Sequence, residues 1–136
     1  MDQALVQAVW QRAGNACEYC RMQQVFTSGS FEIDHIIAKQ HHGASVIGNL
    51  ALSCFHCNLH KGPNIAGIDR VSSSTKLVKL FNPRQHKWGR HFQWDGPRLV
   101  GRTPIGRVTI YVLAINHPAR VAARADLIEE GVFPHS

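Results

Sequence analysis

Four cysteines fall into two Cys-x2-Cys pairs, a spacing that suits the binding of one metal ion. The pairs are Cys17 with Cys20 and Cys54 with Cys57. Each pair can present two thiolates to one tetrahedral Zn²⁺, and two pairs complete a closed site. Four filled positions leave no room for water, so we expect a structural zinc rather than a catalytic one. The alternative is two disulfides, for which the spacing leaves three connectivities open.

The N-terminal residues bear on the choice between zinc and disulfides. Residues 1–5 show neither the basic segment nor the apolar core of a secretory signal. We therefore expect a cytoplasmic protein whose cysteines stay reduced and favour metal. No stretch approaches the roughly 20 apolar residues that a membrane span requires.

Three polar residues near the cysteines have the types that metal-dependent phosphodiester hydrolysis needs. Asp34 and His35 end an alternating run, residues 31–35, which predicts a short strand. Consecutive strand residues point to opposite faces, so the two side chains diverge unless the chain bends after them. A carboxylate is a natural Mg²⁺ ligand, and a neutral imidazole can take a proton from water. Asn58 offers a second oxygen. The alternative is that Asp34 caps a turn and His35 is a surface histidine.

The chain resembles the HNH endonuclease family over residues 17–62, in motifs that follow one another in the family's order: Cys17-x2-Cys20, Ile33-Asp34-His35-Ile36-Ile37, Gly48-Asn49-Leu50 and Cys54-x2-Cys57-Asn58-x2-Lys61-Gly62. The resemblance implies an α+β fold built on a ββα-metal (His-Me finger) unit, a β-hairpin followed by a helix with the nuclease metal between them. The four-cysteine zinc site would hold this unit together, and a further hairpin and helices would follow it. The segment from Asn64 onward resembles the extension of small stand-alone HNH proteins of bacteria, which implies a protein of the bacterial cytosol.

The resemblance also implies roles for individual residues. His35 corresponds to the general base, and Asp34 to a ligand of the catalytic divalent ion. Asn49 corresponds to the asparagine that steadies the loop and orients the base. Asn58 takes the position of the second ligand, while His60 is the rival for that role or a phosphate contact.

These roles together imply a metal-dependent DNA endonuclease or nickase. Zn²⁺ would be structural, Mg²⁺ or Mn²⁺ catalytic, and double-stranded DNA the partner, with a homodimer or a larger defence complex as the assembly. The alternatives are a catalytically inactive, zinc-stabilised nucleic-acid-binding module, or a subunit of a larger defence complex. A binding module gives no reason to combine a base with two oxygen ligands.

The charge distribution favours a nucleic-acid partner. The net charge is +6, and residues 62–125 contain eleven basic and only two acidic residues. Such a surface gains affinity for a phosphate backbone by releasing counterions. The alternative is a solvated basic face without a partner. The candidate nucleic-acid contacts are Lys39, Lys61, Arg84, Lys87 and Arg90.

We expect one domain over residues 1–136, with an N-terminal helix in 1–16, the zinc-bound core in 17–62 and a basic extension in 63–136. The expected elements are a helix over 2–13, a hairpin of 31–35 with a partner near 44–47, a helix from 55 or 56 with Asn58 and Lys61 exposed, a strand over 77–81, a hairpin of 91–94 with 98–101, and helices over 104–115 and 118–130. Residues 104–115 would also suit a strand.

Overall fold

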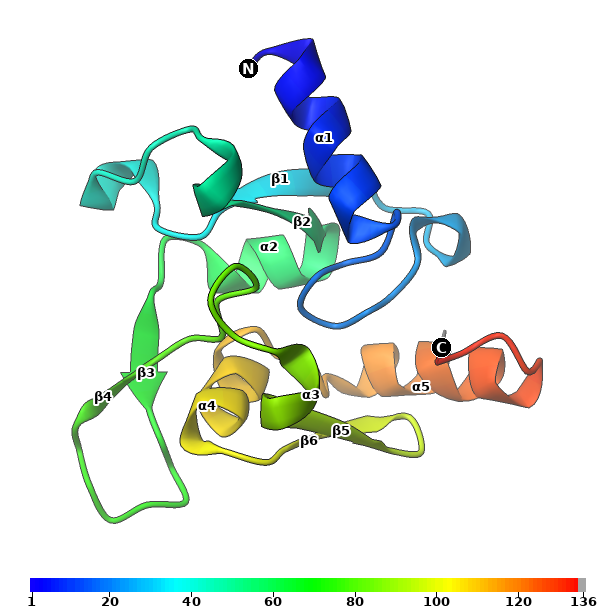
Figure 1. Ribbon diagram of the computed structural model, residues 1–136. Helices are drawn as coiled ribbons and strands as arrows, with labels where there is room; N and C mark the ends of the chain where they lie inside the picture. Colours follow the sequence, from blue (N-terminus) through cyan, green and yellow to red (C-terminus); the bar gives the residue numbers. More distant parts are fainter. Residues whose placement is uncertain (135–136) are drawn as a thin grey trace. The chain divides into compact units, whose positions relative to one another are not determined.

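The computed structural model describes residues 1–134, which form two compact units (Figure 1). Unit 1 comprises Met1–Ile65 together with Asn82–Gln85, and unit 2 comprises Ala66–Phe81 together with the chain from His86 onward. The single nuclease domain over residues 1–136 stays a prediction. None of the helices in the described part of the chain is long and apolar enough to cross a membrane.

Unit 1 opens with the helix α1, Gln3–Ala13, as predicted. The Asp2 carboxylate caps it by accepting a hydrogen bond of 2.8 Å from the backbone N–H of Ala4. Gly14 ends it with φ of 62°, a left-handed conformation that glycine adopts without steric cost. A 3-10 turn, Gln24–Phe26, follows before the first strand.

The hairpin of unit 1 pairs β1, Phe31–His35, with β2, Leu50–Cys54, in antiparallel register. The predicted partner near residues 44–47 is therefore wrong. All five residues of β2 are buried, so this strand lacks the polar–apolar alternation that marks a half-buried strand. The chain between the strands forms a long loop that contains two 3-10 turns, Lys39–His41 and Ile47–Asn49.

The core of unit 1 lies between α1 and the hairpin. Val9, Leu50 and Leu52 are fully buried there, and Trp10 and Phe31 pack against them. Burial of such side chains contributes roughly 1.5–3 kcal/mol each. This packing holds β2 in place, and with it the cysteine at its end.

The helix α2, Phe55–Lys61, follows β2 directly and contacts both strands of the hairpin. Cys54 caps its N-terminus and Gly62, whose φ is 51°, caps its C-terminus. The predicted short helix is thus confirmed in its bounds. Unit 1 therefore contains an antiparallel hairpin followed at once by a helix packed on it.

Unit 2 mixes short strands and helices. Its elements are β3 (Ala66–Ile68), β4 (Leu77–Lys79), α3 (Trp88–His91), β5 (Phe92–Asp95), β6 (Arg98–Gly101), α4 (Pro104–Val112) and α5 (Pro118–Glu129). The β5–β6 hairpin is confirmed, with β5 shifted by one residue. The strand β4 and the helices α4 and α5 are also confirmed, and each ends earlier than predicted. The Thr103 hydroxyl starts α4 by accepting a hydrogen bond from the N–H of Gly106. β3 and α3 were not predicted, because three or four residues give too little periodicity.

Candidate functional site

The four cysteines form one buried cluster. Their sulfur atoms all lie within 4.8 Å of one another, and the sulfurs of Cys20 and Cys54 are 3.8 Å apart. A tetrahedral zinc with Zn–S bonds of about 2.3 Å places its sulfurs roughly 3.8 Å apart, whereas a disulfide requires about 2.05 Å. The four thiols are free. The cluster therefore suits zinc and not two disulfides.

Local backbone geometry shapes the cluster as two similar turns. The N–H of Cys20 donates to the sulfur of Cys17 at 3.5 Å, and the N–H of Cys57 donates to the sulfur of Cys54 at 3.4 Å. Hydrogen bonds with the Cys17, Cys20 and Cys57 thiols lower the pKa of Cys54, which favours its thiolate. A bound zinc would join the turn after α1 to the corner between β2 and α2.

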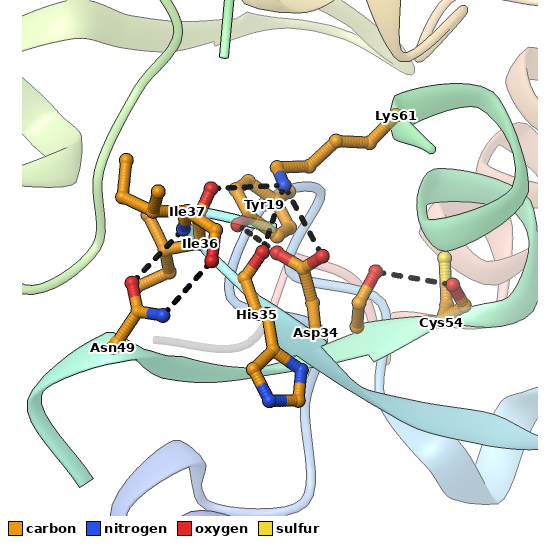
Figure 2. A network of polar contacts seen from close by, with 9 residues as sticks. Tyr19, Asp34, His35, Ile36, Ile37, Asn49, Cys54 and Lys61 are labelled. Atoms are coloured by element: carbon orange, nitrogen blue, oxygen red, sulfur yellow. Dashed lines mark hydrogen bonds and ion pairs between the residues drawn. The ribbon is translucent and has the colours of Figure 1, made fainter. Parts of the chain in front are cut away.

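Asp34 is 4% exposed, and both of its carboxylate oxygens accept hydrogen bonds. The Tyr19 hydroxyl donates to Oδ2 at 2.6 Å, and the Lys61 ammonium donates to Oδ1 at 3.2 Å. Figure 2 shows the carboxylate between these two groups. Burial raises the pKa of Asp34, and the charge of Lys61 and the Tyr19 hydrogen bond oppose this shift.

Lys61 is 1% exposed, so the expectation that α2 presents it to solvent is wrong. Its ammonium donates to the backbone oxygens of His35 at 3.3 Å and Ile36 at 3.2 Å, in addition to Asp34. A buried ammonium needs such partners, because burying an unpaired charge costs several kcal/mol. Lys61 thus faces oxygens of its own chain rather than a phosphate.

The imidazole of His35 lies on the other side of β1 from the Asp34 carboxylate (Figure 2). This divergence is what strand alternation predicts. Ring atom Nε2 is 2.8 Å from the Ser45 hydroxyl oxygen. Burial lowers the pKa of His35, and the nearby charge of Lys39 lowers it further.

One pocket of about 290 Å³ nevertheless joins the predicted site residues. Asp34, His35 and Asn58 all line it, together with Lys39. Among the described residues that line this pocket, His60 does not occur. It lies exposed on α2, with its ring 4.3 Å from that of His56. The structure therefore places Asn58, and not His60, beside Asp34 and His35.

Asn49 closes the loop that follows His35. Its side-chain oxygen accepts a hydrogen bond of 2.9 Å from the N–H of Ile37, and its amide nitrogen donates to the carbonyls of Ile37 at 3.0 Å and Ala44 at 2.9 Å. Gly43 permits this closure. A Cβ on Gly43 would lie 1.7 Å from the Ile37 carbonyl oxygen, so only glycine fits there.

Of the four other basic residues predicted to contact nucleic acid, one has a structural role and three are exposed. The Arg84 guanidinium pairs with the buried carboxylate of Glu18 and donates to the Leu50 carbonyl at 3.2 Å. Its side chain is only 15% exposed. Lys39, Lys87 and Arg90 are exposed.

Sequence reasoning missed Tyr19, Ser45 and Gly43. Tyr19 had a usable signal, since it lies between two cysteines of one pair and must therefore sit beside the metal. Ser45 and Gly43 had none, because their contacts depend on how the loop over 36–49 folds.

Comparison with known families supplies the last observation. Residues 17–64 match the model of the HNH endonuclease family. Comparison with curated proteins found no match, and comparison with solved structures found none either. The matched segment contains both cysteine pairs and every residue that lines the pocket of Asp34, His35 and Asn58. The match of this segment supports the resemblance of the chain to the HNH endonuclease family.

Proposed function

We propose that the protein is a metal-dependent endonuclease or nickase that hydrolyses phosphodiester bonds in DNA. The observation that supports this best is the pocket that Asp34, His35 and Asn58 share inside the HNH segment. A carboxylate, an imidazole and an amide around one small space are the groups that metal-assisted hydrolysis needs.

Asp34 and Asn58 would hold the divalent ion. One carboxylate and one amide oxygen, completed by waters, are the ligands that Mg²⁺ or Mn²⁺ accepts. When bound, such an ion stabilises the negative charge that develops on the phosphate and the leaving oxygen. Asp34 keeps capacity for it, because an ionised carboxylate has about four lone-pair positions and only two are used here.

His35 would act as the general base. Its Nε2 is bonded to Ser45, which leaves Nδ1 as the ring nitrogen that accepts a proton from the attacking water. Its lowered pKa keeps the ring neutral, and hence basic, at physiological pH. Asn49 would serve the base indirectly by holding the loop that carries Ser45.

Unit 2 would supply the sequence-independent affinity for DNA. It contains ten basic and five acidic residues, a net charge of +5, whereas unit 1 contains five and four, a net charge of +1. Lys87 and Arg90 are exposed members of the basic set. Such affinity falls steeply as salt rises.

A second candidate is an inactive, zinc-stabilised nucleic-acid-binding module. One observation favours it: Lys61 already balances the charge of Asp34, so this carboxylate is satisfied without a divalent ion. A subunit role in a larger defence complex would be compatible with either candidate.

A plasmid-nicking assay with Mg²⁺ or Mn²⁺ separates the two candidates. The His35→Ala variant should cut at least about 100-fold more slowly while it binds DNA normally, because loss of a general base costs roughly 10²–10⁴ in rate. His60→Ala is the matched control and should cut normally, since His60 is exposed outside the pocket. A zinc-loaded wild-type protein that binds plasmid and never cuts it would support the inactive module.

A further inference from the structure

The zinc cluster and the proposed ion site are linked by one buried side chain. Tyr19 lies between Cys17 and Cys20 in the first cysteine turn and is 0% exposed. Its hydroxyl donates to Oδ2 of Asp34 at 2.6 Å. This is the short distance of a charge-assisted O–H···O⁻ hydrogen bond.

We propose that Tyr19 is a positioning residue through which the structural zinc fixes the carboxylate that holds the catalytic ion. This inference rests on the function proposed above. With Cys17 and Cys20 bound to one metal, the backbone of Tyr19 would be constrained on both sides. Its buried ring then delivers the hydroxyl to a fixed point beside Asp34.

The second residue that holds Asp34, Lys61, is connected to the other cysteine pair through the helix α2. Lys61 holds Oδ1, and it lies four residues after Cys57 on α2. Residues four apart share one face of a helix, and both of these are buried. The carboxylate is thus held between two side chains, each tied to a different cysteine pair.

This arrangement has a definite consequence for the ion. Groups that hydrogen-bond a metal ligand orient it, and their loss typically lowers metal affinity about 10–100-fold. Opening the first cysteine turn would withdraw the Tyr19 hydroxyl and leave Asp34 held on one oxygen only. Zinc binding at the cysteines would therefore control how tightly the separate Asp34 site holds the catalytic divalent ion.

The Tyr19→Phe variant tests this directly, since it removes one oxygen and keeps the ring. The readout is the Mn²⁺ dissociation constant of the zinc-loaded protein, measured from the electron paramagnetic resonance of free Mn²⁺. We expect binding at least about tenfold weaker, with unchanged zinc content. Tyr111→Phe is the matched control: Tyr111 is the chain's other tyrosine, is 59% exposed, and should leave the constant unchanged.

The Asp34→Asn variant separates the two ways of failing. If Asp34→Asn abolishes Mn²⁺ binding and Tyr19→Phe leaves it intact, the positioning role is overturned and the proposed function stands. If Asp34→Asn binds Mn²⁺ as the wild type does, the ion site of the proposed function is itself overturned.

A second measurement covers a Tyr19→Phe variant that loses zinc or does not fold. Full-length protein labelled with 3-fluorotyrosine gives two ¹⁹F resonances, which Tyr111→Phe assigns. Addition of Mg²⁺ should shift the Tyr19 resonance in a saturable way and leave that of Tyr111 in place. A Tyr19 resonance that does not move at saturating Mg²⁺ would overturn the proposal.

Discussion

Lys61→Met is the substitution whose effect the structure fixes most closely. Methionine keeps the length and apolar stem of lysine but removes the ammonium. That group is 1% exposed and donates to three oxygens, on Asp34, His35 and Ile36, at 3.2–3.3 Å. Its removal leaves a buried carboxylate without a counter-charge and two carbonyls short of a donor. Breaking a buried ion pair on one side costs about 3–5 kcal/mol.

This cost is large beside the total stability of a small protein, about 5–15 kcal/mol. Urea unfolding of the zinc-loaded protein, followed by circular dichroism, measures it. Lys39→Met is the matched control: Lys39 is an exposed lysine of the same pocket, and its loss should change the free energy of unfolding by less than about 0.5 kcal/mol.

A double-mutant cycle with Asp34→Asn isolates the pair. In the Asp34→Asn background the Lys61→Met change should cost less than it does alone, because no unpaired carboxylate remains. Saturating Mn²⁺ should also restore part of the stability of the Lys61→Met protein, up to about 2.7 kcal/mol at 100 times the dissociation constant. A loss below about 1 kcal/mol for Lys61→Met would refute the view that Lys61 is the counter-charge of Asp34.

Three further predictions concern the loop, the zinc and the base. Gly43→Ala should lower both the melting temperature and any nicking activity, because its Cβ would lie 1.7 Å from the Ile37 oxygen; unchanged values would contradict the loop closure. Zinc chelation should make the four buried cysteines reactive to a thiol reagent and unfold the hairpin, as circular dichroism would report; thiols that stay protected would contradict a zinc role. The base works when neutral, so the rising limb of kcat/KM against pH should lie below the ordinary histidine pKa of 6.5, and Lys39→Gln should move it upward by removing a nearby positive charge. A limb above 6.5, or one that Lys39→Gln moves downward, would exclude His35 as that base.

Local patterns predicted the helices α1, α2, α4 and α5 and the cysteine cluster, because their signals lie within a few residues of one another. The caps at Asp2 and Thr103 mark helix starts by short hydrogen bonds along the chain. Cys-x2-Cys likewise fixes two sulfurs within one turn. These features need no knowledge of the rest of the fold.

Contacts between distant segments were not predictable in this way. β2 lacks alternation because all five of its residues are buried. The local pattern predicts Lys61 as a solvent-exposed helix residue, because its partner Asp34 lies 27 positions away in the sequence. Arg84 reads as a phosphate contact, although its partner Glu18 lies 66 positions away. In each case tertiary packing overrides the local preference of the residue type.

Residues 82–85 return to unit 1 from the middle of unit 2, so the HNH segment does not contain all the residues that pack in its unit. Arg84 belongs to unit 1, although its neighbours before Asn82 and after Gln85 belong to unit 2. A fusion protein that borrowed only the first 65 residues would leave Glu18, 7% exposed, without the guanidinium of Arg84, and the Leu50 carbonyl would keep only the hydrogen bond from Arg12. Grafting this segment into another scaffold therefore requires an arginine delivered from outside it.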